Sequence, residues 1–193
     1  MTDGLLLPAD SGERVQSMRL LVGAEHSDVF SAFEAVVQPG FDVGAHWHDE
    51  AREMFYVIDG ELDLLAFAPA EPAGQDWRRW TSKTGQTVFR GGPGSFMYVP
   101  AGCPHAFFNP GRTPARMLFA VAPSGHEAYL RELGDLLSTG APPDQSEIGA
   151  PRLRYDIHQL TSPVNRPVGW AGRPARQAGG AAPPSETMRR VGC

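Results

Sequence analysis

Two short blocks of regularly spaced residues constrain this chain of 193 residues more than any other feature. Each block combines glycines, which favour turns and close backbone approaches, with side chains that bind metal ions. The first block has the spacing G-x5-H-x-H-x4-E-x6-G, and the second has the spacing G-x5-P-x-G-x2-H-x3-N. The residues are, in order, Gly40, His46, His48, Glu53 and Gly60, followed by Gly94, Pro100, Gly102, His105 and Asn109.

The spacing within the first block predicts that three of its side chains face one interior. Side chains alternate between the two faces of a β-strand, so His46 and His48 project from the same side and Trp47 from the other. Glu53 follows His48 by five residues, which would place it on the opposite face of a continuous strand. Residues 49–52 are polar and typical of a turn. We therefore predict that a new strand begins at Glu53 and returns its carboxylate to the interior.

The second block supplies a fourth candidate ligand. We predict a strand over residues 96–99, a turn of the Pro-x-Gly kind at 100–102, and a further strand that begins at His105. Several imidazoles and one carboxylate suit divalent iron, nickel, manganese, copper or zinc better than calcium or magnesium. The sequence therefore predicts one divalent transition metal ion, bound by His46, His48, Glu53 and His105. The glycines, the proline and the asparagine are assigned architectural roles.

This paired pattern resembles the two motifs of the cupin superfamily over about residues 15 to 125. The resemblance implies an all-β fold, a double-stranded β-helix or jelly-roll barrel, in a single copy. Flanking segments are similar to those of quercetinase-like single-domain cupins, among them Met18–Gly23, Phe30–Glu34 and Arg154–Ile157. This second resemblance implies a metal-dependent dioxygenase that acts on an enolic or phenolic, flavonol-like small molecule. Glu53 would then bind the metal and also accept the hydroxyl proton of the substrate.

Two other functions remain open at this stage. The chain could be a non-redox zinc enzyme, such as a polyketide cyclase or an isomerase, because zinc and iron accept the same four ligands. It could also be a module that binds a small molecule without converting it. The side chains expected around the metal are mostly apolar, which favours an apolar or aromatic substrate that chelates through oxygen. These side chains are Phe55, Val57, Phe96, Met97, Phe107, Met117 and Phe119.

Composition divides the chain into three parts. Residues 1–13 form a lead, residues 14–160 form one cupin domain with its motifs at 40–60 and 94–109, and residues 161–193 form a tail. The tail is rich in proline, glycine and alanine, and it contains five arginines and a single acidic residue, Glu186. Because it also lacks hydrophobic periodicity, we predict that it is disordered.

Local patterns predict the remaining elements. Alternating apolar residues predict strands over 14–22, 29–37, 61–67 and 116–122, and a further strand over 152–160. A helix with an apolar stripe is predicted over about 124–138. Ser124 would cap it, Glu127 would complete an S-x-x-E capping box, and Gly140 would end it.

Two further features have ordinary roles as their simplest interpretation. Trp77 and Trp80 lie in a long connection, residues 68–87, and either anchor it to the barrel or form a lid over the mouth. The histidines outside the two blocks are expected at the surface or at helix caps. These are His26, His126 and His158.

Charge and hydropathy limit the expected partners and location. Of the chain's 17 basic and 22 acidic side chains, five arginines and one glutamate lie in the tail, which leaves 12 basic and 21 acidic in residues 1–160. This acidic body disfavours nucleic acid as a partner. No apolar run approaches the roughly 20 residues of a membrane helix, and residues 1–8 do not resemble a secretory signal. With only two cysteines, a cytoplasmic location is expected, and apolar outward-facing strand residues suggest a homodimer.

Overall fold

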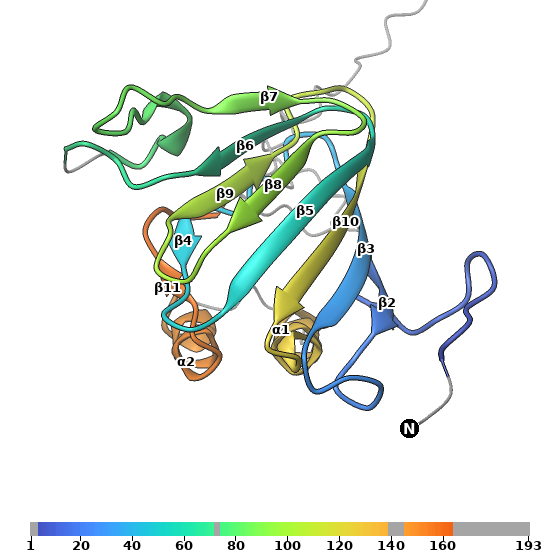
Figure 1. The fold of residues 1–193 in the computed structure, drawn as a ribbon. Coiled ribbons are helices and arrows are strands. Elements are labelled where there is room, and N and C mark those ends of the chain that lie inside the picture. Colours follow the sequence, from blue (N-terminus) through green and yellow to red (C-terminus); the bar gives the residue numbers. More distant parts are fainter. Residues whose placement is uncertain (1–3, 72–73, 139–144, 164–193) are drawn as a thin grey trace, which may run out of the picture.

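A computed structural model describes residues 4–71, 74–138 and 145–163 of the chain, and these residues fold into two antiparallel sheets that face each other (Figure 1). One sheet has the strand order β1 (Arg14–Val15), β2 (Met18–Val22), β3 (Ser31–Val37), β10 (Ala115–Ala122), β5 (Arg52–Asp59) and β8 (Phe96–Val99). The other has the order β11 (His158–Gln159), β4 (His46–Trp47), β9 (His105–Phe108), β6 (Leu62–Ala66) and β7 (Phe89–Gly91). The described residues therefore form the expected all-β, jelly-roll barrel.

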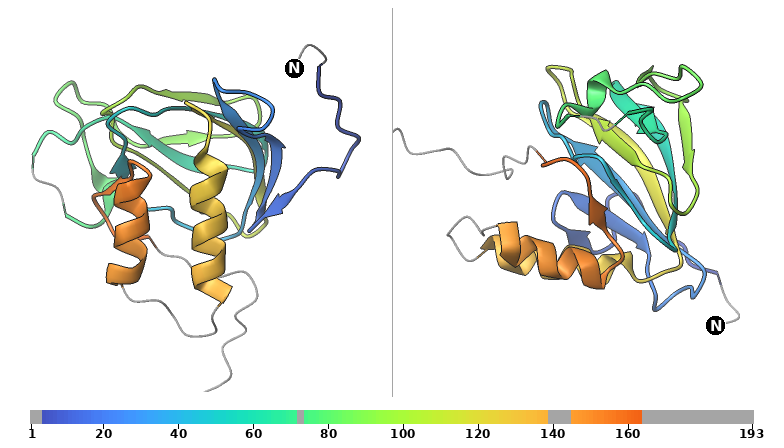
Figure 2. Two further views of the ribbon diagram at one scale, coloured as in Figure 1. Left: turned by 90° about the horizontal axis from the view of Figure 1, so that it is seen from below. Right: turned by 90° about the vertical axis from the view of Figure 1, so that its left-hand side faces the viewer.

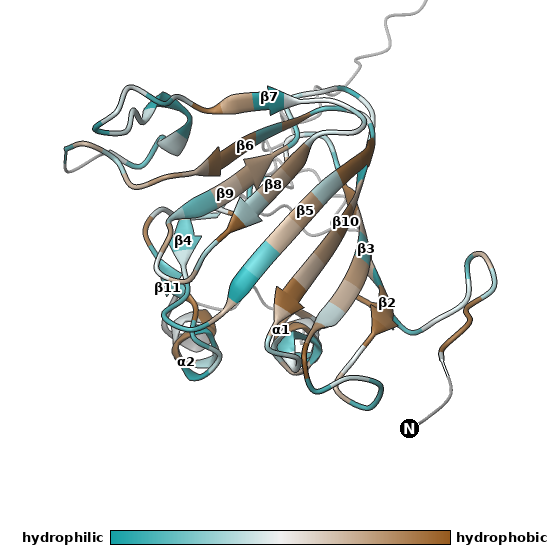
Figure 3. Cartoon of the chain, viewed as in Figure 1, coloured by the Kyte–Doolittle hydropathy of each residue, from teal (hydrophilic) through white to brown (hydrophobic). Residues whose placement is uncertain are grey.

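Three phenylalanines in register hold the centre of the larger sheet together. Phe119 of β10 lies opposite Phe33 of β3 on one side and opposite Phe55 of β5 on the other. Its ring centroid is 5.5 Å from that of Phe33 and 5.0 Å from that of Phe55, and both pairs are stacked. Figure 3 shows hydrophobic residues along β3 and β10 and a hydrophilic start to β5. Burial of each such ring stabilises the fold by about 2–3 kcal/mol.

Two predicted strands near the ends of the domain are wrong. The strand expected over 14–22 is a hairpin of β1 and β2, in which Val15 pairs with Met18. Gln16, with a φ of 53°, makes the turn between them, and the apolar alternation passes through it without interruption. The strand expected over 152–160 is instead the end of helix α2 (Gln145–Arg154) followed by the short strand β11. Helix α2 contains Pro151, a residue that usually argues against a helix.

Helix α1 (His126–Ser138) confirms the predicted helix but not its capping box. The carboxylate of Glu127 accepts hydrogen bonds from the backbone N–H of Ala24, at 2.7 Å, and from the hydroxyl of Ser31, at 2.6 Å. It therefore ties the helix to β3 and to the loop before it. The predicted end of the helix at Gly140 lies outside the described residues. Seen from below, α1 and α2 lie side by side across one end of the barrel (Figure 2).

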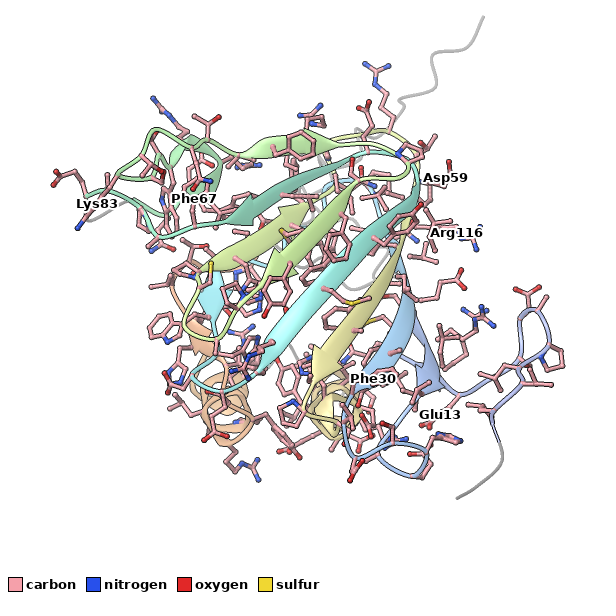
Figure 4. The ribbon with its side chains drawn as sticks, viewed as in Figure 1. Glu13, Phe30, Asp59, Phe67, Lys83 and Arg116 are labelled. Atoms are coloured by element: carbon pink, nitrogen blue, oxygen red, sulfur yellow. The ribbon has the colours of Figure 1, made fainter. Side chains whose placement is uncertain are left out.

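The long connection between β6 and β7 is anchored to the outside of the barrel. It contains a short 3-10 helix, η1 (Trp77–Arg79), and the side chains of Trp77 and Trp80 are buried. The indole N–H of Trp77 donates to Asp42 Oδ1 at 2.9 Å, and both rings pack in a cluster with Phe67. Figure 4 shows this connection projecting sideways, with Lys83 near its outer end. These contacts support the anchoring role and not the lid.

The described chain ends at residue 163, so residues 164–193 of the predicted disordered tail lie outside it. Thr161, at the start of that tail, is buried, and its hydroxyl oxygen accepts the backbone N–H of Ala45 at 2.8 Å. Among the described helices, none has the length and hydropathy needed to cross a membrane.

Candidate metal centre

Four side chains from both sheets converge at the barrel end that lies nearest the helices. His46 on β4 pairs directly with His105 on β9, and Glu53 is the second residue of β5. His48 immediately follows β4 and shares its inward face with His46. Ligand atoms from all four residues lie within 4.8 Å of one another. The structure thus brings together all four predicted ligands, and the new strand begins at Arg52, one residue before the predicted start.

The four side chains are close and are almost completely removed from solvent. The ring centroids of His46 and His105 are 4.2 Å apart, and His48 lies 5.3 Å from each of them. His48 Nε2 is 3.1 Å from one oxygen of Glu53, and His105 Nε2 is 2.8 Å from the other. Each of the four residues exposes 9% or less of its surface. A metal ion bound here would therefore be shielded from bulk water.

The backbone orients every imidazole in the same way. The Nδ1 atoms of His46, His48 and His105 lie 2.9, 2.6 and 3.1 Å from the carbonyl oxygens of Gly44, Asp156 and Cys103. A carbonyl only accepts, so each Nδ1 carries the proton and each Nε2 keeps its lone pair. This is the arrangement that metal-binding histidines usually show, with the second ring nitrogen held by a carbonyl or carboxylate.

Two buried nitrogens in the cluster test whether the residues fit a metal ion. His48 Nε2 and His105 Nε2 are buried and make no hydrogen bond of normal geometry, although both lie near Glu53. A buried polar atom without a partner costs about 1–3 kcal/mol, so such atoms are rare unless a ligand satisfies them. Three imidazoles and a carboxylate are the donors that divalent transition metals prefer. The residues therefore fit one such ion.

The electrostatics hold two of the four groups, Glu53 and His46, in the protonation states that bind cations. Burial alone would raise the pKa of Glu53, but His105 and His48 outweigh it and hold this pKa well below its usual value. Burial, reinforced by His105, places the pKa of His46 well below its usual value. For His48, burial lowers the pKa, but the carboxylate of Glu53 more than offsets it, and the pKa is raised. At neutral pH, Glu53 is ionised and His46 is neutral.

Sequence reasoning missed one histidine beside the cluster. His126, the first residue of α1, was expected at the surface or as a cap. Its ring centroid is instead 6.4 Å from that of His48 and 5.6 Å from that of Phe119. Burial lowers its pKa to about 4, so the ring is neutral at pH 7. Only the packing of α1 against the barrel brings His126 here, and no spacing in the sequence indicates it.

Aromatic side chains surround the cluster on the barrel side. The ring of Phe55 lies 6.2 Å from that of His105 and 5.8 Å from that of Phe107. Phe96 was expected in this group, but it faces outward and is 58% exposed, while its neighbour Met97 is buried. A shift of one residue along a strand inverts the side that each residue faces, and this explains the error.

A two-sheet barrel with three histidines and one glutamate at its end defines a small jelly-roll protein able to hold a metal ion. Residues 20–133 match the family model described as Cupin, and the chain belongs to this family. No curated protein matches the chain significantly.

Solved structures with the same general architecture are only distantly similar. Protein BH2720 of Bacillus halodurans is 18% identical, with a TM-score of 0.45, over 58% of this chain and 74% of that one. The cupin domain of Cnp3 from Schizosaccharomyces pombe is 18% identical, with a TM-score of 0.44, over 66% and 78%. The polyketide cyclase RemF from Streptomyces resistomycificus is 24% identical, with a TM-score of 0.42, over 55% and 64%. Similarity at this level assigns no activity to the chain.

Proposed function

We propose that this protein is a metal-dependent cupin enzyme, a dioxygenase that acts on an enolic or phenolic small molecule. One observation carries the proposal: three imidazole Nε2 atoms and one carboxylate converge in a buried, phenylalanine-lined interior. His46, His48, Glu53 and His105 would hold the ion. A divalent ion bound there would polarise the oxygen atoms of a chelating substrate and, if redox-active, support reaction with dioxygen.

The residues of the chain set limits on the substrate. Phe55, Phe107 and Phe119 pack together beside the cluster and make this interior apolar, which favours a substrate with an aromatic ring. Because the pKa of Glu53 is held low, its carboxylate is a weak base and accepts protons only from acidic groups. An enolic or phenolic hydroxyl meets this requirement far better than an ordinary alcohol does.

A second function is favoured by His126. The imidazole of His126 lies beside the metal ligands and is uncharged at pH 7, because burial lowers its pKa to about 4, so it offers a second proton-transfer group besides Glu53. An isomerase moves a proton from one carbon to another, and a cyclase that closes a ring by an aldol step removes a proton from carbon and returns one to oxygen, so both need a proton-transfer group and neither needs dioxygen. In that case the bound ion would be zinc, and His126 would exchange a proton with the substrate.

Oxygen uptake separates the two functions. The apoprotein is loaded with Fe²⁺, Ni²⁺ or Zn²⁺, a flavonol such as quercetin is added as the probe, and dissolved oxygen is followed with an electrode. We expect uptake with iron or nickel that depends on the probe, and a loss of roughly 100-fold or more in Glu53→Gln. Glu50→Gln, an exposed carboxylate in the adjacent turn, should leave the rate unchanged. Conversion of enolic probes by the zinc form without oxygen uptake would instead support the cyclase or isomerase.

We also propose that the outer faces of β5 and β8 join two copies of the chain. Five apolar side chains on these two paired strands are each more than one third exposed, and β8 is an edge strand. Pairing about a two-fold axis would cover this patch on both copies. The side chains are Met54, Tyr56, Ile58, Phe96 and Tyr98.

Light scattering during gel filtration tests this assembly. We expect a dimer for the natural chain and a monomer for Phe96→Glu, because a charge buried in an apolar interface costs several kcal/mol. Phe89→Glu provides a matched control, since Phe89 is 59% exposed on β7 of the other sheet. A natural chain that is monomeric at micromolar concentration would contradict the proposal.

A further inference from the structure

The segment after α2 reaches the metal ligands through Asp156. The backbone oxygen of Asp156 accepts a hydrogen bond from His48 Nδ1 at 2.6 Å, across 108 residues of sequence. This contact fixes the rotation of the His48 ring and directs its Nε2 atom toward Glu53 and His105. The other two imidazoles are held by carbonyls two residues away in the chain, those of Gly44 and Cys103. His48 alone depends on a distant segment for its orientation.

The side chain of the same residue holds the turn that joins two of the ligands. One carboxylate oxygen of Asp156 accepts the backbone N–H of Asp49 at 2.7 Å, and the other accepts those of Glu50 and Ala51 at 2.9 and 3.2 Å. These three residues connect His48 to the strand that carries Glu53. The carboxylate therefore fixes the chain between the two ligands, while the backbone oxygen fixes one ligand ring.

The backbone conformation at residue 156 normally favours glycine, which indicates that the aspartate carboxylate has a specific role. The N–H of Ile157 donates to the carbonyl of Arg152 at 2.8 Å, and the N–H of Asp156 donates to that of Leu153 at 3.3 Å. This pair of bonds is the Schellman motif that ends many helices, and its left-handed position strongly favours glycine. Asp156 occupies that position with a φ of 59°. An aspartate tolerates this conformation less well than glycine. We infer that its side chain contributes the hydrogen bonds to the 49–51 turn that glycine cannot make.

We propose that Asp156 is a positioning residue of the metal centre, which sets the geometry of His48 and of the 49–51 turn and thereby the affinity for the ion. The α2–β11 segment, which lies beside β4 and the start of β5, is then part of the metal site and not only a cover for the barrel (Figure 1). The inference rests on the metal-binding function proposed above. It assigns no contact between Asp156 and the ion itself.

Substitution by glycine separates this role from a purely structural one. Asp156→Gly removes the carboxylate but supplies the residue that the Schellman motif prefers. This preference offsets part of the stability lost with the three hydrogen bonds, so the apoprotein should remain folded. Asp156→Asn keeps the shape but replaces one accepting oxygen with an amide NH2 group. Asp49→Asn is the control. The exposed Asp49 carboxylate lies 2.9 Å from His158 Nε2 and, together with Asp156 and His158, forms a second group of possible cation ligands, so an unchanged affinity in this variant assigns the effect of Asp156 to the buried centre.

The test is a Co²⁺ titration of the full-length apoprotein, followed through the visible absorption of the bound ion. We expect the dissociation constant to rise about 10- to 100-fold in Asp156→Gly and Asp156→Asn, with an altered absorption spectrum, and to stay unchanged in Asp49→Asn. Natural affinity and spectrum in both Asp156 variants would overturn the inference while leaving the metal site intact. Failure of the natural chain to bind Co²⁺ would overturn the metal site and this inference together.

Discussion

His48→Ala is expected to reduce bound metal from about one equivalent per chain to a negligible amount, while the barrel remains folded. His48 is one of four donors, and its Nε2 is buried without a hydrogen bond of its own. Loss of a ligand removes one coordination bond and leaves the other donors with an incomplete set. Changes in groups that merely support a ligand already weaken metal binding about 10- to 100-fold, and the loss of a ligand should exceed this. Elemental analysis of the purified variant is the measurement.

His26→Ala is the matched control for this experiment. His26 lies in the loop between β2 and β3, and it belongs to neither group of possible metal ligands among the described residues. We expect this variant to retain a full equivalent of metal. Circular dichroism spectra of both variants, recorded with a chelator so that no metal is bound, show whether the fold is kept. Full metal retention by a folded His48→Ala would contradict the ligand set.

Phe55→Ala should lower the free energy of unfolding by about 3–5 kcal/mol. Phe55 is 2% exposed and stacks on Phe119, so truncation removes a large apolar surface and leaves a cavity between the sheets. Urea unfolding of the apoprotein gives the change, and an unchanged m-value would show that the unfolded state is unaffected. Working without metal keeps the measurement independent of the binding site.

Phe89→Ala is the control, because it removes a phenyl ring from an exposed position instead of a buried one. Phe89 is 59% exposed, so its truncation should change stability by less than about 1 kcal/mol. An equal loss in both variants would show that the ring cluster at Phe55 does not hold the core together.

The sequence was sufficient to locate the four clustered side chains, the candidate metal ligands, because the spacing within each block is local. Strand alternation places His46 and His48 on one face, and the polar turn before Glu53 corrects the register of the next strand. The same reasoning predicted β8, β9, β10 and α1 to within a few residues. Each of these elements has a clear apolar pattern and a turn at its boundary.

Features that depend on tertiary contacts could not be predicted. The turn at Gln16 interrupts an alternating pattern without any glycine or proline, and α2 forms although it contains Pro151. His126 and Asp156 reach the metal ligands only because two helices pack across the end of the barrel. Both residues contact His48, which is 78 and 108 residues away in the sequence, and no periodic pattern in the sequence indicates contacts over such separations.

The origin of the ligands on two different sheets has a mechanical consequence. His46 and His105 belong to the smaller sheet and Glu53 to the larger one, so an ion held by all three acts as a cross-link between the halves of the barrel. Above saturation, each tenfold rise in free metal would add about 1.4 kcal/mol to the stability of the fold. Supply of the ion would then govern how long the protein survives in a cell as well as whether it can react.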